Sequence, residues 1–160
     1  MKKRRITILG ALGLGLLSLR EAEAQSADQA AFERALKQCQ SAETAEQCKQ
    51  ALPMCEEAQW RLPKLAPGEQ REKKEDGLLN DWAGCEKAVG RYADAEGHWR
   101  SLLTLRQRRY GPEHPEVAQS LNNLALVLES QGKYAEAETL DRKALAIRQT
   151  LLGPEHPDVA

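Results

Sequence analysis

Apolar residues recur at helical spacing in the C-terminal half of this chain. One stripe follows the i, i+4, i+7, i+8, i+11 pattern of an amphipathic helix and consists of Val117, Leu121, Leu124, Ala125 and Leu128. A second stripe consists of Ala137, Leu140, Ala144, Leu145 and Leu151. Gly132 lies between them, where a left-handed residue lets the chain reverse. The pattern predicts two antiparallel helices.

The same pattern occurs twice at a constant displacement. The segment GRYADAE begins at Gly90 and returns as GKYAEAE at Gly132, 42 residues later, and both copies run on to a GPEHP block. Pro115 and Pro157 suit the first turn of a helix, and the GPEH residues before each of them form a turn. A constant period of this length predicts an array of helical hairpins.

The segment SLNNLALVLESQGKYAEAETLDRKALAIRQTLLGPEHPDVA resembles the long tetratricopeptide repeat of the kinesin-light-chain type. The small and large signature positions of that family are occupied by Leu121, Leu124, Ala125, Gly132, Tyr134, Ala137 and Ala144. HEAT and armadillo arrays have a similar period, but the QGKYAEAE turn favours the tetratricopeptide repeat. The resemblance implies an all-α fold, a right-handed α-solenoid of antiparallel helix hairpins.

The 42-residue step also predicts the domain organisation. We expect a repeat region over 66–160, with repeats at about 76–111 and 115–153 and the start of a further repeat at 157–160. The turn APGEQREKKEDG before the first repeat lacks the GPEHP pattern, so we expect it to be longer and more mobile. Residues 25–65 are expected to form a divergent, cysteine-containing hairpin that caps the array. Its helices would span 28–40 and 45–60, and Pro53 predicts a kink or break in the second.

The N-terminus has the layout of a secretory signal. Four basic residues, Lys2 to Arg5, precede the apolar run Ile6 to Leu19, and Ala22-Glu23-Ala24 follows as a cleavage motif. Fourteen apolar residues rise about 21 Å as a helix, short of the roughly 30 Å hydrocarbon core. We therefore predict that residues 1–24 are a signal peptide cleaved between Ala24 and Gln25, on the general secretion route. The mature protein would be periplasmic or extracellular in a bacterium, and free of the membrane.

Charge narrows the classes of partner. The net charge is −1 for the whole chain. Residues 1–24 carry five basic and two acidic side chains, so their removal changes the net charge to −4. This balance does not favour nucleic acid or an anionic membrane as a partner.

All four cysteines fall in the divergent half of the chain, and their even number predicts two disulfides in an exported protein. Helices that reverse near residue 43 would place Cys39 opposite Cys48. Helices that reverse near residue 70 would place Cys55 opposite Cys85. A link from Cys48 to Cys55 would span about 10 Å along one helix, which is too far for a disulfide. The sequence thus predicts Cys39–Cys48 and Cys55–Cys85.

Candidate chemistry is sparse. The cysteine spacings match no common zinc finger, and recurrence of His114 and His156 in the GPEHP turns indicates a structural role near a helix start. His98 could pair with a thiol, but no third group to orient it is evident. We expect no metal, no cofactor and no catalytic residue, and hence a non-enzymatic protein. Arg106, Arg108 and Arg109 form a basic cluster that suits the C-terminal end of a helix, and an acidic peptide could also use it.

A stack of hairpins has a concave face, and binding of a protein or peptide is its default function. In proteins that resemble this one, first-helix residues line the groove, and asparagines there hold the backbone of an extended peptide or partner helix. By this resemblance the candidate binding residues are Asn80, Gln119, Asn122, Asn123, Leu126 and Glu129.

Two further hypotheses follow from the repeat that begins at Pro157. The chain could be the front part of a larger protein, with more repeats or an enzymatic module such as a caspase-like protease after them. Alternatively, the outer face of helix 134–151 lacks a capping helix and could support self-association.

Overall fold

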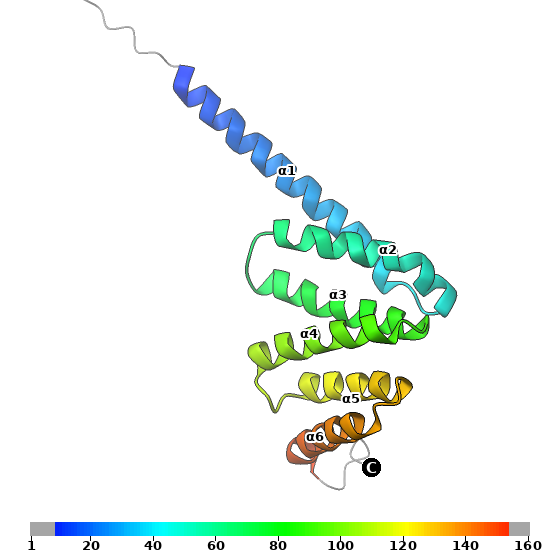
Figure 1. Ribbon diagram of the computed structural model, residues 1–160. Helices are drawn as coiled ribbons and strands as arrows, with labels where there is room; N and C mark the ends of the chain where they lie inside the picture. The colour runs from blue at the N-terminus through cyan, green and yellow to red at the C-terminus, as the bar shows by residue number, and fades with distance from the viewer. Residues whose placement is uncertain (1–8, 154–160) are drawn as a thin grey trace, which may run out of the picture.

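The computed structural model describes residues 9–153, with side chains from residue 22 onward, and this part of the chain is all helical. The helices are α1 Leu9–Gln40, α2 Ala45–Arg61, the short 3-10 helix η1 Leu62–Lys64, α3 Glu69–Ala88, α4 Tyr92–Tyr110, α5 Pro115–Ser130 and α6 Tyr134–Leu152. Helices α2 to α6 stack in chain order, each antiparallel to the one before, while the N-terminal part of α1 projects beyond the stack (Figure 1). The prediction of an all-α solenoid is confirmed.

The turn inside each repeat explains why its glycine recurs. Gly90 and Gly132 have φ angles of 81° and 77°, a left-handed conformation that glycine adopts without steric cost. After α5 the Lys133 N–H donates to the Leu128 carbonyl (2.8 Å), and the Gly132 N–H donates to the Glu129 carbonyl (2.9 Å). The same pair of bonds follows α3, from Arg91 to Glu86 and from Gly90 to Lys87. These are Schellman caps, which end one helix and reverse the chain within two residues.

The GPEHP turn has a structural role at the start of α5. His114 is the N-cap residue, and its Nδ1 accepts a hydrogen bond from the Glu116 N–H (3.2 Å). The His114 ring also stacks on Tyr110, with 4.6 Å between ring centroids, and Pro115 occupies the first helical turn. The expected structural role is therefore confirmed for His114. His156 and the expected start of a further repeat at 157–160 lie outside the described residues.

The connection before α3 is shorter than expected. Helix α3 begins at Glu69, so only Leu65 to Gly68 separate it from η1, and the prediction of a long turn was wrong. Residues 69–76 are rich in Glu, Lys, Gln and Arg, which are good helix formers, and Lys73 pairs with Glu69 one turn away (2.8 Å).

Helix α2 continues through Pro53 from Ala45 to Arg61, so the predicted break does not occur. Pro53 has no N–H to donate to the backbone carbonyl four residues before it. Because Pro53 lies on the exposed side of α2, that carbonyl can bind water instead. A capping box supports the start of α2, because Thr44 accepts from the Gln47 N–H and the Gln47 side chain accepts from the Thr44 N–H.

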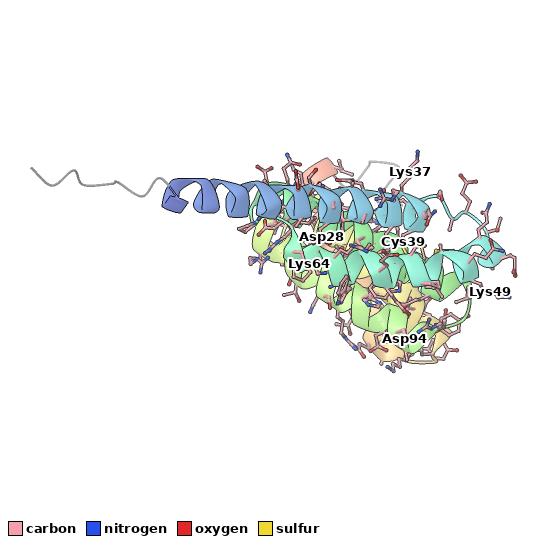
Figure 2. The ribbon with its side chains drawn as sticks, turned by 90° about the horizontal axis from the view of Figure 1, so that it is seen from above. Asp28, Lys37, Cys39, Lys49, Lys64 and Asp94 are labelled. Atoms are coloured by element: carbon pink, nitrogen blue, oxygen red, sulfur yellow. A yellow bond between two sulfur atoms is a disulfide. The ribbon has the colours of Figure 1, made fainter. Side chains whose placement is uncertain are left out.

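The disulfide pairing corrects the prediction. The bonds are Cys39–Cys55 and Cys48–Cys85, with Cα–Cα distances of 5.2 and 4.9 Å, and not Cys39–Cys48 and Cys55–Cys85. The prediction assumed a reversal near residue 70. Because α2 and η1 run to Lys64 and α3 starts at Glu69, the reversal is centred near residues 66–67 and places Cys48 opposite Cys85. Cys55 then meets Cys39, which lies where α1 runs beside α2 (Figure 2).

Two large clusters of buried residues, and a smaller one between α5 and α6, form the interior. The N-terminal core joins α1, α2, η1 and α3 and comprises Phe32, Ala35, Leu36, Cys39, Cys48, Leu52, Cys55, Ala58, Leu62, Leu65, Leu78, Trp82 and Cys85. The repeat core joins α3 to α6 and comprises Leu79, Ala83, Ala95, Trp99, Leu102, Leu105, Leu124, Ala125, Val127, Leu128 and Ala137. Small residues at Ala83, Ala95, Ala125 and Ala137, each at most 1% exposed, let neighbouring helices approach closely.

Candidate partner-binding surface

Three of the six candidate binding residues meet in one cavity. Asn80 of α3 and Gln119 and Asn123 of α5 line a cavity of about 340 Å³ between the first helices of consecutive hairpins. Their side chains lie at the surface of the stack, Asn80 and Asn123 half-buried and Gln119 exposed. The structure thus brings amide groups from two repeats to one site, which we call the amide groove.

Hydrogen bonds orient two of these amides. The Gln119 Oε1 accepts from Arg106 Nη1 (3.3 Å), which leaves the NH₂ group of Gln119 to donate to a ligand. The Asn80 Nδ2 donates to Asp81 Oδ1 (3.1 Å), which leaves the Asn80 carbonyl oxygen to accept. A peptide backbone presents both a donor and an acceptor at each residue, so it matches such a set.

The other three candidates lie elsewhere. Asn122 and Glu129 line a separate cavity of about 780 Å³ between α5 and α6, on the outer side of the last hairpin. Leu126 is 40% exposed on α5 and lines neither cavity. Adjacent helical residues point about 100° apart, since a turn takes 3.6 residues, so Asn122 and Asn123 serve different surfaces.

Sequence reasoning missed the part of the amide groove that precedes the repeats. Gln40 at the end of α1, Glu43 in the following turn, and Lys87 of α3 line it together with the Cys48–Cys85 disulfide and Trp99. Lys87 stands one 42-residue step before Glu129, so the repeat offset could have indicated it. Nothing in the sequence indicated Gln40 or Glu43, because they enter the groove only through the packing of α1 and α2 on α3.

The basic cluster is not a free ligand site. Arg106 is 4% exposed, and its Nη2 donates to Asp76 Oδ1 (2.7 Å) while its Nη1 donates to Ser120 Oγ (3.1 Å). Arg109 lies 3.5 Å from Glu69, and Arg108 lies 3.6 Å from Glu72. The use of this cluster by an acidic peptide is therefore not supported, because acidic residues of α3 already pair with all three arginines.

His98 has a partner that the sequence did not reveal. Its Nδ1 lies 2.7 Å from Glu86 Oε2, and its ring stacks on Trp82 with 4.1 Å between centroids. Glu86 is only 1% exposed, so the pair anchors α4 to α3. All four cysteines are in disulfides, and no thiol is available to His98.

The described residues contain neither a metal-binding cluster nor a helix that could cross a membrane. No group of three or more His, Cys, Asp or Glu side chains there is arranged to hold a metal ion. No helix in that part of the chain combines the length and apolar character needed to cross a membrane.

Comparison with known proteins places the chain in a family. The sequence model of the tetratricopeptide repeat matches residues 76–150 and again residues 116–160, which together span more than half of the chain. The chain belongs to the tetratricopeptide repeat family. Repeats of this family form scaffolds for protein–protein interaction that are generally not enzymatic.

A solved structure shows the same fold. The chain is similar to the crystal structure of BtubC (BKLC) from P. vanneervenii, with a TM-score of 0.59 and 24% sequence identity. The likeness covers 70% of this chain and 43% of BtubC, so the chain spans less than half the length of that protein. No curated protein matches the chain significantly.

Proposed function

We propose that this chain is a non-enzymatic scaffold that binds an extended peptide segment of a partner protein in the amide groove. The observation that carries the proposal is the convergence of Asn80, Gln119 and Asn123 from α3 and α5 on one cavity. Side-chain amides can donate to and accept from a peptide backbone at the same time. They therefore hold an extended chain with little dependence on its side chains.

A peptide-display library panned on the immobilised chain tests this proposal. We expect peptides to be enriched, and the variant Asn80→Ala/Asn123→Ala to bind them about 5- to 150-fold more weakly, since each of the two lost hydrogen bonds contributes about 0.5–1.5 kcal/mol. The matched control is Asn122→Ala, an identical change on the neighbouring position of α5 that faces the other cavity. Helicity by circular dichroism should not change in either variant. Equal binding by the parent and the double variant would contradict the assignment.

We further propose that residues 1–24 are a signal peptide and that the protein acts in the periplasm or outside a bacterial cell. Two observations support export. Residues 22–27 are all exposed, whereas Asp28, the next residue of α1, is partly buried and pairs with Arg61 (2.9 Å). Two disulfides also suit an oxidising compartment.

The N-terminus of the exported protein tests this second proposal. Expression in a bacterium with intact secretion, followed by intact-mass measurement of the periplasmic fraction, should give the mass of a chain that begins at Gln25. Retention of the whole chain in the cytoplasm would contradict it.

The alternative that these repeats precede further repeats or an enzymatic module such as a caspase-like protease stays a hypothesis. The coding sequence beyond Ala160 tests it directly.

A further inference from the structure

The amide groove contains an open space at a position where the next repeat carries a large side chain. Gly84 of α3 lines the groove, and a Cβ atom added to Gly84 would meet no atom within 4 Å. One 42-residue step later, the same position of α5 is Leu126, whose side chain is 40% exposed. The repeat pattern would therefore place a leucine side chain in this space, and the glycine leaves it open.

The packing of the helices does not explain this glycine. Gly84 lies inside α3 and has no positive φ angle, so its backbone is one in which alanine would favour the helix more than glycine does. Gly77, two turns earlier, is different. A Cβ atom there would come within 3.2 Å of Gln40 Nε2, so the small residue admits the end of α1. No such neighbour lies over Gly84, and the space is available to a group from outside the chain.

Small apolar groups line the groove together with Gly84. Ala88 lies one turn after Gly84 on α3, and Ala42 lies in the turn before α2. The Cys48–Cys85 disulfide joins α2 to α3 and lines the groove as well. We call the part of the groove formed by these groups and Gly84 the Gly84 pocket. Their side chains offer no strong hydrogen-bond donor or acceptor, so an apolar group suits them better than water does.

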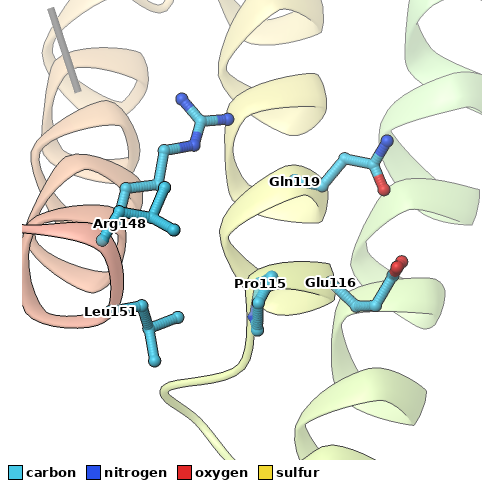
Figure 3. A pocket seen from close by; sticks show the side chains of 6 residues that line it. Pro115, Glu116, Gln119, Arg148 and Leu151 are labelled. Carbon is cyan, nitrogen blue, oxygen red and sulfur yellow. The ribbon is translucent and has the colours of Figure 1, made fainter. Parts of the chain in front are cut away.

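Polar groups line the rest of the groove. The Gln119 side chain extends from α5 toward the earlier helices and away from α6 (Figure 3), so it borders the groove on the α5 side. Asn80 and Asn123 supply the other amides, and Lys87 and Glu43 supply charges of opposite sign. A combination of apolar and polar lining is typical of sites that bind proteins, in which apolar groups are buried and polar groups remain at the rim.

An unpaired hydrogen-bond donor also lines the groove. Trp99 of α4 is 4% exposed, and its indole Nε1 has no hydrogen-bond partner among the described residues. A buried N–H without an acceptor is unfavourable. An extended peptide carries a carbonyl oxygen at every residue and can bring one to this donor. The groove thus has an unfilled apolar space and an unpaired donor, and a peptide with an apolar side chain suits both.

We propose that the Gly84 pocket binds one large apolar side chain, that of leucine, methionine or phenylalanine, from the peptide that the amide groove holds. This inference rests on the proposed function, because the amides hold the peptide backbone while the Gly84 pocket selects among side chains. Burial of such a side chain strengthens binding by about tenfold or more. The groove therefore prefers peptides with a large apolar residue at one position, a preference that backbone contacts alone do not produce.

Filling the pocket tests the proposal. Peptides are selected from a random-peptide display library on the parent chain, and their affinities are measured by fluorescence anisotropy. We expect a large apolar residue at one fixed position of the selected peptides. Gly84→Leu should weaken their binding by about tenfold or more, because it puts into the pocket the side chain that Leu126 carries in the next repeat. Gly84→Ala should weaken it less.

Gly97→Leu is the matched control. Gly97 also lies inside a helix, and an added Cβ atom would meet nothing within 4 Å there, but it belongs to α4 and lines a different cavity. This variant should bind the selected peptides as tightly as the parent does. Thermal unfolding should show that both Gly84 variants are at least as stable as the parent, since alanine and leucine favour a helix more than glycine does.

A change in the peptide gives a second measurement. Replacing its large apolar residue by alanine should weaken binding to the parent by about tenfold or more, because the pocket is then left unfilled. The same replacement should have little effect on binding to Gly84→Leu, whose pocket is already filled. Equal effects on the two chains would place the apolar residue of the peptide elsewhere and overturn the proposal.

Failure of this inference can be distinguished from failure of the proposed function. Selected peptides that share no apolar position, or that bind Gly84→Leu as tightly as the parent, would reject the Gly84 pocket. If those peptides still lost affinity for Asn80→Ala/Asn123→Ala, the amide groove would remain the binding site. Enrichment of no peptide at all would reject both the proposed function and the Gly84 pocket.

Discussion

At the scale of single residues, Arg106 and Arg148 occupy the same position of consecutive repeats but have different surroundings. Its Nε donates to both carboxylate oxygens of Asp76 (2.9 and 3.2 Å), and its Nη1 donates to the Glu116 carbonyl (3.1 Å). A buried guanidinium is tolerated when its N–H groups are paired in this way. Arg148 occupies the same position of the next repeat but is only half-buried. Two features differ: α5 lies over Arg106, and the position of Asp76 is occupied by Ala118 in the next repeat.

Replacement of Arg106 should be strongly destabilising. We expect Arg106→Met to lower the free energy of unfolding by about 3–5 kcal/mol, because Asp76 is left as an unpaired, largely buried charge. The control Arg108→Met removes an arginine that is 68% exposed and should change stability by less than about 0.5 kcal/mol. Urea unfolding followed by circular dichroism measures both. A similar decrease in the free energy of unfolding in the two variants would show that the ion pairs of Arg106 do not stabilise the fold more than those of Arg108.

At the scale of elements, Glu96 holds α4 to the turn between α5 and α6. Its Oε2 accepts hydrogen bonds from Gln131 Nε2 (2.8 Å) and Lys133 Nζ (2.7 Å), and Arg100 bridges Glu96 to Glu136 of α6. Burial by itself would raise the pKa of Glu96. The hydrogen bonds from Lys133 and Gln131 and the charges of Arg100 and Lys133 outweigh it, so the pKa is lowered from 4.5.

This lowered pKa predicts an acid dependence of stability. A carboxyl group whose pKa is lower in the folded state stabilises the fold above its unfolded-state pKa, and the contribution is lost as pH falls through the folded-state pKa. The loss for Glu96 therefore lies below pH 4.5. We expect the free energy of unfolding to fall less steeply in this range for Glu96→Gln than for the parent chain.

Urea unfolding at a series of pH values measures this slope. Glu46→Gln is the control, since Glu46 is exposed in a pair with Lys49. Its slope should match that of the parent. An unchanged slope in Glu96→Gln would contradict the assigned role.

At the scale of the whole molecule, the two cores differ in what holds them together. Both disulfides lie in the N-terminal core, whereas the repeat core contains no cysteine. Helix α5 is packed between α4 and α6 and has eight buried residues, while α6 has two. Solenoid stability is roughly a sum of units and their interfaces, so local stability should vary along the stack.

Loss of the disulfides should affect the two cores unequally. In a variant with all four cysteines replaced by serine, we expect faster hydrogen exchange in α1 and α2, because each disulfide contributes about 2–4 kcal/mol. Exchange in α5 should change little, since its buried residues pack mainly on α4 and α6. Hydrogen exchange followed by mass spectrometry gives both rates from one sample. An equal increase in all helices would show a single cooperative unit instead.

The sequence by itself determined the repeat and most of the helices. The step from Gly90 to Gly132 and the apolar stripes predicted α4, α5 and α6, because both depend on local chemistry: glycine where φ is positive, proline where a helix begins, and apolar residues at helical spacing. Local chemistry did not predict that α3 begins at Glu69, since a charged helix start resembles a charged loop.

Only the tertiary structure decided the relations between helices. It paired Cys48 with Cys85 and Cys39 with Cys55, it divided Asn122 and Asn123 between two surfaces, and it buried Arg106 more deeply than Arg148. The physical reason is that the shift of one packed helix along its neighbour, and its rotation about its own axis, depend on contacts between residues far apart in the chain. A shift of the α2–α3 reversal by a few residues was enough to change both disulfides.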